Sequence, residues 1–245
     1  MMFKPLDRRR LLGVAGAAVF AAFHAQAETC QIAVSFTYNH WSRLHPWGEQ
    51  LRGKISAWWP AISRALGDGV CASGKTIDIE FARLSPASVA AEAEGDRIIV
   101  NAPYVLANLG NADMFRMIAH ELAHVAQAYP GWARPRWMTE GIADYVRYYI
   151  LFPNDPGRPF DPSREDWREG YAPAAGLIDF AERGWPGSLA RVNAAMRSGA
   201  DGEAVLAEST GLSMAALWAR YLATNPADAS PAKRRAYARS LKHAS

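Results

Sequence analysis

Two histidines and a glutamate stand close together in the middle of the chain, as His120, Glu121 and His124. On a helix, residues four apart share one face, so both imidazoles can reach one metal ion. This H-E-x-x-H spacing is typical of zinc sites in which the glutamate acts as general base on a water molecule. The competing interpretation is two histidines that happen to fall one helical turn apart.

A catalytic zinc ion needs three protein ligands and one open position. The longer pattern H-E-x-x-H-x-x-G-x-x-H is excluded, because Gln127 and Pro130 occupy its glycine and last histidine positions. A glutamate on a following helix is the other source, and Glu140 is separated from His124 by 15 residues, enough for an antiparallel return. The alternative interpretation of Glu140 is a carboxylate favoured by a helix N-terminus.

Asp144 follows Glu140 by one helical turn and therefore lies on the same helix face. A carboxylate there can accept the second N–H of a ligand histidine, which fixes the tautomer and raises basicity. We therefore predict that His120, His124 and Glu140 bind zinc and that Asp144 supports them. His40 and His45 lie between the predicted strands at residues 32–38 and 76–84 and are interpreted as structural or surface residues.

The elements that must position these residues follow from apolar periodicity. Alternation predicts strands at residues 32–38, 76–84, 89–93 and 97–101, the last two joined as a hairpin. Helical spacing predicts helices at residues 47–66, 111–129 (capped by Asn111 or Asp113), 139–151, 172–183, 187–198, 201–209 and 213–223. Strands followed by helices predict an α+β fold, with a small mixed β-sheet packed on the active-site helix and a mainly helical C-terminal half.

Residues 1–27 have the pattern of a signal peptide. Lys4 and the run Arg8–Arg10 precede an apolar stretch at 11–23 that is too short to span a bilayer, and Ala25–Ala27 is a small-x-small cleavage pattern. We expect cleavage before Glu28 and export to the periplasm or the medium. The paired arginines resemble a twin-arginine signal, and an ordinary Sec signal is the alternative.

The basic charge of the chain lies in this leader. Residues 28–245 contain 23 Lys and Arg and 23 Asp and Glu, so nothing indicates a nucleic-acid partner. We expect no stable membrane insertion once the leader is removed. Residues 225–245 are predicted to be a polar tail.

Cys30 and Cys71 are the two cysteines of the chain. In an exported protein an even number of cysteines favours a disulfide, and two unpaired thiols are the alternative.

The segments His120–Gln127 and Glu140–Arg147 together resemble the basic secretory protein family of plants and bacteria. The resemblance extends to Trp167–Tyr171 and Leu217–Tyr221, and it covers about residues 95–224. It implies a zincin-like metallopeptidase domain, which we expect at residues 28–224, with zinc held by two histidines and a glutamate.

Two further roles are implied by this resemblance. Zincins stabilise the oxyanion of the tetrahedral intermediate with a Tyr or His from a later helix, and Tyr171 falls in the family's Gly-Tyr pattern. Tyr145 and Tyr148 are rivals, and a packed aromatic residue is the alternative interpretation of Tyr171. Zincins also pair an extended substrate with an edge strand, for which residues 97–101 are the candidate.

The predicted function is that of an exported zinc-dependent metallopeptidase, most simply an endopeptidase, acting on a peptide or protein substrate. Two alternatives stay open: a catalytically weak or inactive zincin-fold binding protein of the cell envelope, and hydrolysis of a non-peptide amide. The sequence leaves the oligomeric state undetermined.

Overall fold

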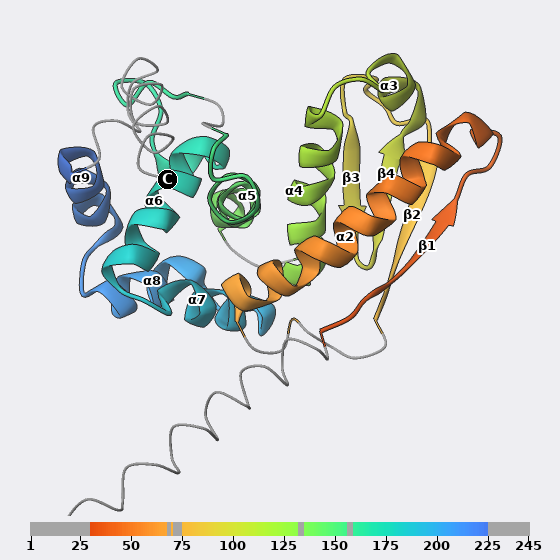
Figure 1. The fold of residues 1–245 in the computed structure, drawn as a ribbon. Coiled ribbons are helices and arrows are strands. Elements are labelled where there is room, and N and C mark those ends of the chain that lie inside the picture. The colour runs from red at the N-terminus through yellow and green to blue at the C-terminus, as the bar shows by residue number, and fades with distance from the viewer. Residues whose placement is uncertain (1–29, 68–69, 71–74, 132–134, 156–158, 225–245) are drawn as a thin grey trace, which may run out of the picture.

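A four-stranded β-sheet covered by helices forms the first half of the described chain, and helices alone form the second half (Figure 1). The computed structural model describes residues 30–67, 70, 75–131, 135–155 and 159–224. The elements are β1 (Ala33–Thr37), η1 (Ser42–Leu44), α2 (His45–Leu66), β2 (Thr76–Ala82), β3 (Ala91–Glu94), β4 (Arg97–Asn101), α3 (Ala102–Ala107), α4 (Asp113–Gln127), α5 (Arg136–Tyr145), η2 (Val146–Leu151), η3 (Trp167–Glu169), α6 (Tyr171–Gly184), α7 (Ser188–Arg197), α8 (Gly202–Thr210) and α9 (Met214–Thr224). This arrangement confirms the predicted α+β fold.

Several predictions concern residues outside the described part of the chain. The signal peptide at residues 1–27 and the polar tail at 225–245 both lie there. Cys30 is buried and disulfide-bonded, whereas Cys71, its predicted partner, also lies outside the described residues. In the described residues, no helix combines the length and the apolar character that crossing a membrane requires.

The sheet has the strand order β1-β2-β4-β3, with β3 antiparallel to β4 and the other pairs parallel. The expectation that residues 97–101 form the substrate-facing edge is therefore wrong, because β4 lies between β2 and β3. Ile98 and Val100 of β4 are completely buried, whereas Glu92 and Glu94 of β3 are exposed. Exposed charged residues are typical of an edge strand, and β3 is the edge next to α4.

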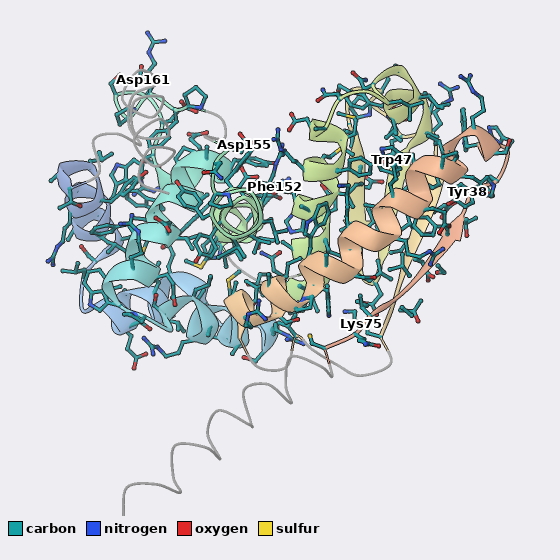
Figure 2. All side chains as sticks on the ribbon, in the orientation of Figure 1. Tyr38, Trp47, Lys75, Phe152, Asp155 and Asp161 are labelled. Carbon is teal, nitrogen blue, oxygen red and sulfur yellow. The ribbon has the colours of Figure 1, made fainter. Side chains whose placement is uncertain are left out.

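Helices α2 and α4 pack against each other beside the sheet (Figure 1). Helix α4 buries Ile118, Leu122 and Val125 completely, so the opposite side of the same helix is left for polar residues. It ends where Ala128 adopts the left-handed conformation, with φ of 47°. Lys75, which Figure 2 shows beside the start of β2, donates to the Val125 carbonyl in the last turn.

Helix α5 lies between α4 and α6 and begins earlier than predicted (Figure 1). The sequence predicts a start at Thr139 or a neighbouring residue, whereas Pro135 takes the N-cap position and Arg136 is already helical. Proline is compatible with the beginning of a helix. The predicted continuation to Leu151 is a π-helix, η2, which starts at Val146.

The close approach of α5 and α6 depends on a glycine. A Cβ atom at Gly141 would lie 2.5 Å from Cβ of Ala174, closer than side chains tolerate. The pair therefore lets two helix backbones pack tightly directly beside Glu140. Since α6 begins at Tyr171, this packing also fixes the position of that tyrosine relative to α5.

The end of the π-helix is joined to α4 by charged and aromatic contacts. Arg116 of α4 lies 3.2 Å from Asp155, and its guanidinium lies 5.6 Å from the ring centroid of Phe152. Figure 2 shows Phe152 and Asp155 in the region where the two halves of the molecule meet. The short helix α3 was not predicted, because six residues are too few for apolar periodicity to identify a helix, although Pro103 stands at a position that favours a helix start.

Candidate metal centre

Helix α4 places two histidine side chains on the side that faces α5. His120 and His124 stand one turn apart, with their Nε2 atoms 3.1 Å from each other. The imidazole rings are nearly perpendicular, at 85°, and their centroids are 4.8 Å apart. Both Nε2 atoms therefore point to the same small volume, as two ligands of one ion require.

Glu140 of α5 completes this group from the opposite side. Its Oε2 atom lies 3.4 Å from Nε2 of His120 and 3.6 Å from Nε2 of His124. Ligand atoms about 2.0–2.2 Å from a tetrahedral zinc ion lie about 3.3–3.6 Å from one another, and the three separations are within about 0.2 Å of that range. His120, His124 and Glu140 can therefore hold a metal ion between them.

The other ring nitrogens of the two histidines are also occupied. Nδ1 of His120 lies 2.8 Å from Oδ1 of the buried Asp144. Nδ1 of His124 lies 2.7 Å from Oε1 of the buried Gln127. Each acceptor holds its histidine with the proton on Nδ1, so the lone pair of Nε2 is directed at the metal position.

The charges of these groups are strongly coupled. Burial by itself lowers the pKa of His120, but hydrogen bonds to Asp144 and Glu140 outweigh it and raise the pKa to about 9. Burial likewise raises the pKa of Glu140, and the hydrogen bonds from both histidines reverse this and keep it well below the usual range. The site therefore stabilises an ionised Glu140 and attracts positive charge.

Glu121 lies beside the ligands without belonging to them. Burial raises its pKa above the ordinary carboxylate value, and the nearby His120 and His124 oppose that rise. The backbone of Ala93 in β3 lies next to its carboxylate and also opposes the rise, to the smallest extent. This contact joins the carboxylate next to the metal position to the edge strand.

A cavity of about 610 Å³ opens over these groups. Its walls come from the edge strand, α4, α5 with the start of η2, and the start of α6. The lining residues are Val89, Ala90, Ala91, Glu92, Ala93, Met117, His120, Glu121, His124, Arg136, Glu140, Asp144, Arg147, Tyr148 and Tyr171. Every site residue predicted from the sequence thus lines this one cavity. These residues come from α4, α5 and the start of α6.

Tyr171 reaches this cavity from the first position of α6. Its ring is stacked on that of His120 with centroids 6.1 Å apart, and 45% of the residue remains exposed. Its φ of 45° is strained for a tyrosine, and such strain is concentrated at functional sites. Gly170 precedes it with φ of 72°, and a Cβ there would lie 3.3 Å from Cβ of Glu140.

The rival residues differ in position. Tyr145 is buried away from the cavity, whereas Tyr148 lines it. Arg147 also lines the cavity and pairs with Asp113 at 3.1 Å. His45 is stacked on Tyr38 with ring centroids 3.8 Å apart, outside the cavity walls.

Sequence reasoning missed Gln127 as a partner of the site. In the sequence, Gln127 stands out only as the residue at the glycine position of the longer zinc-binding pattern. Its spacing was the available signal, because a residue three positions after His124 lies one turn further along the same helix.

The chain was also compared with known proteins. A family model described as a peptidase of plants and bacteria matches residues 80–221, more than half of the chain. No curated protein and no solved structure matches. The matched range contains both His120–Gln127 and Glu140–Arg147, on which the resemblance in the sequence rests.

Proposed function

Because this chain belongs to the family of peptidases of plants and bacteria, we propose that it is a zinc-dependent metallopeptidase that is exported and cleaves within extended peptides. One observation carries the zinc assignment: ligand atoms of His120, His124 and Glu140 converge at separations of 3.1–3.6 Å beside a general-base candidate. Two imidazoles and one carboxylate are a donor set of catalytic zinc sites. The adjoining cavity leaves room for water and substrate at the fourth position.

The metal would be held by Nε2 of both histidines and by Oε2 of Glu140. When bound, a zinc ion there supplies Lewis acidity, which polarises a peptide carbonyl and makes a water molecule more acidic. Asp144 keeps His120 oriented for this task through Nδ1. The depressed pKa of Glu140 means that its carboxylate is ionised and ready to bind a cation at neutral pH.

Glu121 is proposed as the general base. It is buried beside the two histidines, and burial raises its pKa toward the range in which a carboxylate both accepts and releases a proton. In hydrolysis it would take a proton from the attacking water and deliver it to the nitrogen of the leaving amine.

Tyr171 is proposed to donate a hydrogen bond to the oxyanion of the tetrahedral intermediate. Burial and the neighbouring Glu140 carboxylate raise the pKa of its hydroxyl, so the hydroxyl keeps its proton at neutral pH. A preorganised donor at such a position contributes about 3 kcal/mol to transition-state stabilisation. The strained backbone at Tyr171 supports this role, because the left-handed φ directs the side chain into the cavity.

The substrate would bind along β3, which replaces β4 as the proposed docking strand. The backbone N–H of Asn101 donates to the carbonyl of Ala90 across the hairpin. Hydrogen-bonded residues alternate in an antiparallel ladder, so Glu92 bonds to β4 while Ala91 and Ala93 direct backbone groups away from the sheet. An extended peptide can pair with these outward groups, which is the reason to propose cleavage within a chain.

Export is proposed from the pattern of residues 1–27 alone. Detection of a chain that begins at Glu28 outside the cytoplasm would support it. Recovery of the full-length chain in the cytoplasmic fraction would contradict it.

The activity is tested with the mature chain, from Glu28 onward, on a peptide library analysed by mass spectrometry. We expect internal cleavage, about one zinc ion per chain, loss of activity with a chelator and recovery with zinc. Glu121→Gln should still bind zinc and lose cleavage at least about 100-fold. Glu49→Gln on α2, outside the cavity, is the matched control and should cleave normally. Cleavage by Glu121→Gln at the normal rate would contradict the proposed base.

A further inference from the structure

We infer that Gln127 is a positioning residue of the metal centre, which orients His124 and ties it to the helix that carries Glu140. The inference rests on the proposed zinc site. It assigns a role to a residue that is neither a ligand nor part of the cavity wall. The supporting observation is that the buried carboxamide of Gln127 makes two hydrogen bonds, one to each of the helices that carry the metal ligands.

The surroundings of Gln127 make its contacts specific. Only 1% of the residue is exposed, so the carboxamide has no access to bulk water and must be satisfied by protein groups. Oε1 accepts from Nδ1 of His124 at 2.7 Å. Nε2 donates to the carbonyl of Thr139 at 2.8 Å. Acceptor and donor are both occupied at good distances.

The first contact determines which nitrogen of His124 can bind a metal. A neutral imidazole carries one proton, and the carbonyl oxygen of Gln127 holds that proton on Nδ1. Nε2, which lies 3.6 Å from Oε2 of Glu140, is then left with a free lone pair. Without the acceptor, the proton could move to Nε2 and the ring could turn, and both changes oppose metal binding.

The second contact links the ligands to each other. Thr139 directly precedes Glu140, so the hydrogen bond from Gln127 fixes the backbone beside the third ligand. Helix α4 ends at Gln127, and the chain must leave it and return as α5. A bridge at this point keeps the two helices at the spacing that the three ligand atoms need.

The residue type follows from these two demands. Asp144 serves His120 by accepting only, and a carboxylate is sufficient for that. Gln127 must accept from His124 and donate to Thr139 at once, which Asp and Glu cannot do when ionised. This explains why a glutamine stands where the longer zinc-binding pattern would have a glycine.

The test compares two substitutions at Gln127 in the mature chain. Gln127→Met has a similar length and removes both hydrogen bonds, whereas Gln127→Glu keeps the acceptor for His124 and loses the donor to Thr139. Zinc affinity is measured by competition with a chelating indicator on each folded protein. The tautomer of His124 is read from long-range ¹H–¹⁵N NMR spectra of the metal-free and zinc-loaded forms.

We expect zinc affinity to fall about 10–100-fold in Gln127→Met, the usual effect of removing such a partner. In Gln127→Glu we expect only partial recovery, because the acceptor for His124 returns while the carbonyl of Thr139 stays without its donor. The His124 resonances of metal-free Gln127→Met should shift toward the form protonated on Nε2. Should Gln127→Met not fold, the NMR spectrum of Gln127→Glu decides: Nδ1 of His124 must remain protonated.

Asn193 provides the matched control, because it is also 1% exposed and also bridges two segments, accepting from Tyr129 and donating to Leu66. Asn193→Leu should lower stability but leave the zinc affinity of the folded protein within about threefold of wild type. Equal zinc affinity in wild type and Gln127→Met, with an unchanged His124 tautomer, would overturn the inference. Failure of the wild-type chain to bind zinc would instead overturn the proposed function.

Discussion

Nδ1 of His120 lies 2.8 Å from Oδ1 of Asp144, and this contact joins helix α4 to helix α5 inside the protein. Asp144 is only 6% exposed, so its carboxylate is buried at a position where it accepts a hydrogen bond from this imidazole. The contact orients the ring, fixes its tautomer and makes Nε2 a stronger donor to a metal.

Asp144→Ala should therefore weaken zinc binding about 10–100-fold, the range for loss of a carboxylate behind a ligand histidine. Zinc affinity is measured by competition with a chelating indicator. Asp113→Ala is the control, since Asp113 contacts Arg116 and Arg147 and neither histidine, and it should stay within about threefold of wild type. An equal loss in both variants would mean that general negative charge, rather than the contact to His120, is responsible.

Tyr171→Phe should lower kcat about 100–1000-fold and leave KM and zinc affinity near their wild-type values. The reason is that a hydroxyl that bonds only the oxyanion contributes to the transition state and not to substrate binding. Steady-state kinetics on a peptide identified in the library screen provide both constants.

Tyr148→Phe is the companion measurement, because Tyr148 is the rival that lines the cavity. Its pKa is raised to about 12 by burial, so it too keeps its proton at neutral pH. If Tyr148→Phe lowered kcat and Tyr171→Phe did not, Tyr148 would be the oxyanion donor in place of Tyr171.

The ligand set could be predicted because zinc chemistry restricts both residue type and spacing. His120 and His124 fit one helical turn, and Glu140 with Asp144 fits a second helix that returns antiparallel. Gln127 could not be predicted in the same way. Its second partner is the backbone carbonyl of Thr139, and any residue type would provide that group.

The strands could be predicted from alternation, but the pairing of the hairpin with the rest of the sheet could not. Both arms alternate, so periodicity alone does not show which arm joins β2. Composition was the unused signal. Residues 98–100 are Ile-Ile-Val, which suits an interior strand buried on both faces, whereas β3 alternates alanine with glutamate.

Ala91→Pro should raise KM for extended peptides by about tenfold while the protein remains folded. Proline removes an N–H that points away from the sheet, and edge strands tolerate proline at such positions. Glu92→Pro, which removes an N–H directed at β4, should destabilise the sheet instead. The measurements are KM and the thermal midpoint of each variant. An unchanged KM in a folded Ala91→Pro protein would exclude pairing at this residue.

Gly141→Ala should destabilise the protein by about 1–3 kcal/mol, because the new Cβ would lie 2.5 Å from that of Ala174. Adding Ala174→Gly removes the clash, so the double mutant should recover part of the loss and show a coupling of about 1 kcal/mol in a double-mutant cycle. Gly53→Ala on α2, where nothing lies within 4 Å, should stabilise by about 0.5–1 kcal/mol. Free energies of unfolding from urea titrations of wild type, both single mutants and the double mutant give the coupling, and the same titration is made on Gly53→Ala.

Stability should also fall above pH 10, and Tyr129 should contribute to the decline. Burial raises the pKa of Tyr129, a shift that Arg197 only partly opposes. The folded state then holds the phenolic proton more tightly than the unfolded state, whose pKa is about 10. The stabilisation is fully present below pH 10 and is lost as the pH rises from there toward the folded pKa, by about 1.4 kcal/mol per pH unit.

Tyr129→Phe isolates this contribution from the other groups that titrate in the same range. At pH 7 the variant should be less stable by about 1 kcal/mol, since it loses the 2.8 Å hydrogen bond to Asn193. Above pH 10 it no longer has a proton to lose at this position, so its free energy of unfolding should fall less steeply than that of wild type. Urea titrations at pH 7, 9, 10.5 and 11.5 should show the gap closing, and a constant gap would mean that Tyr129 has an ordinary pKa.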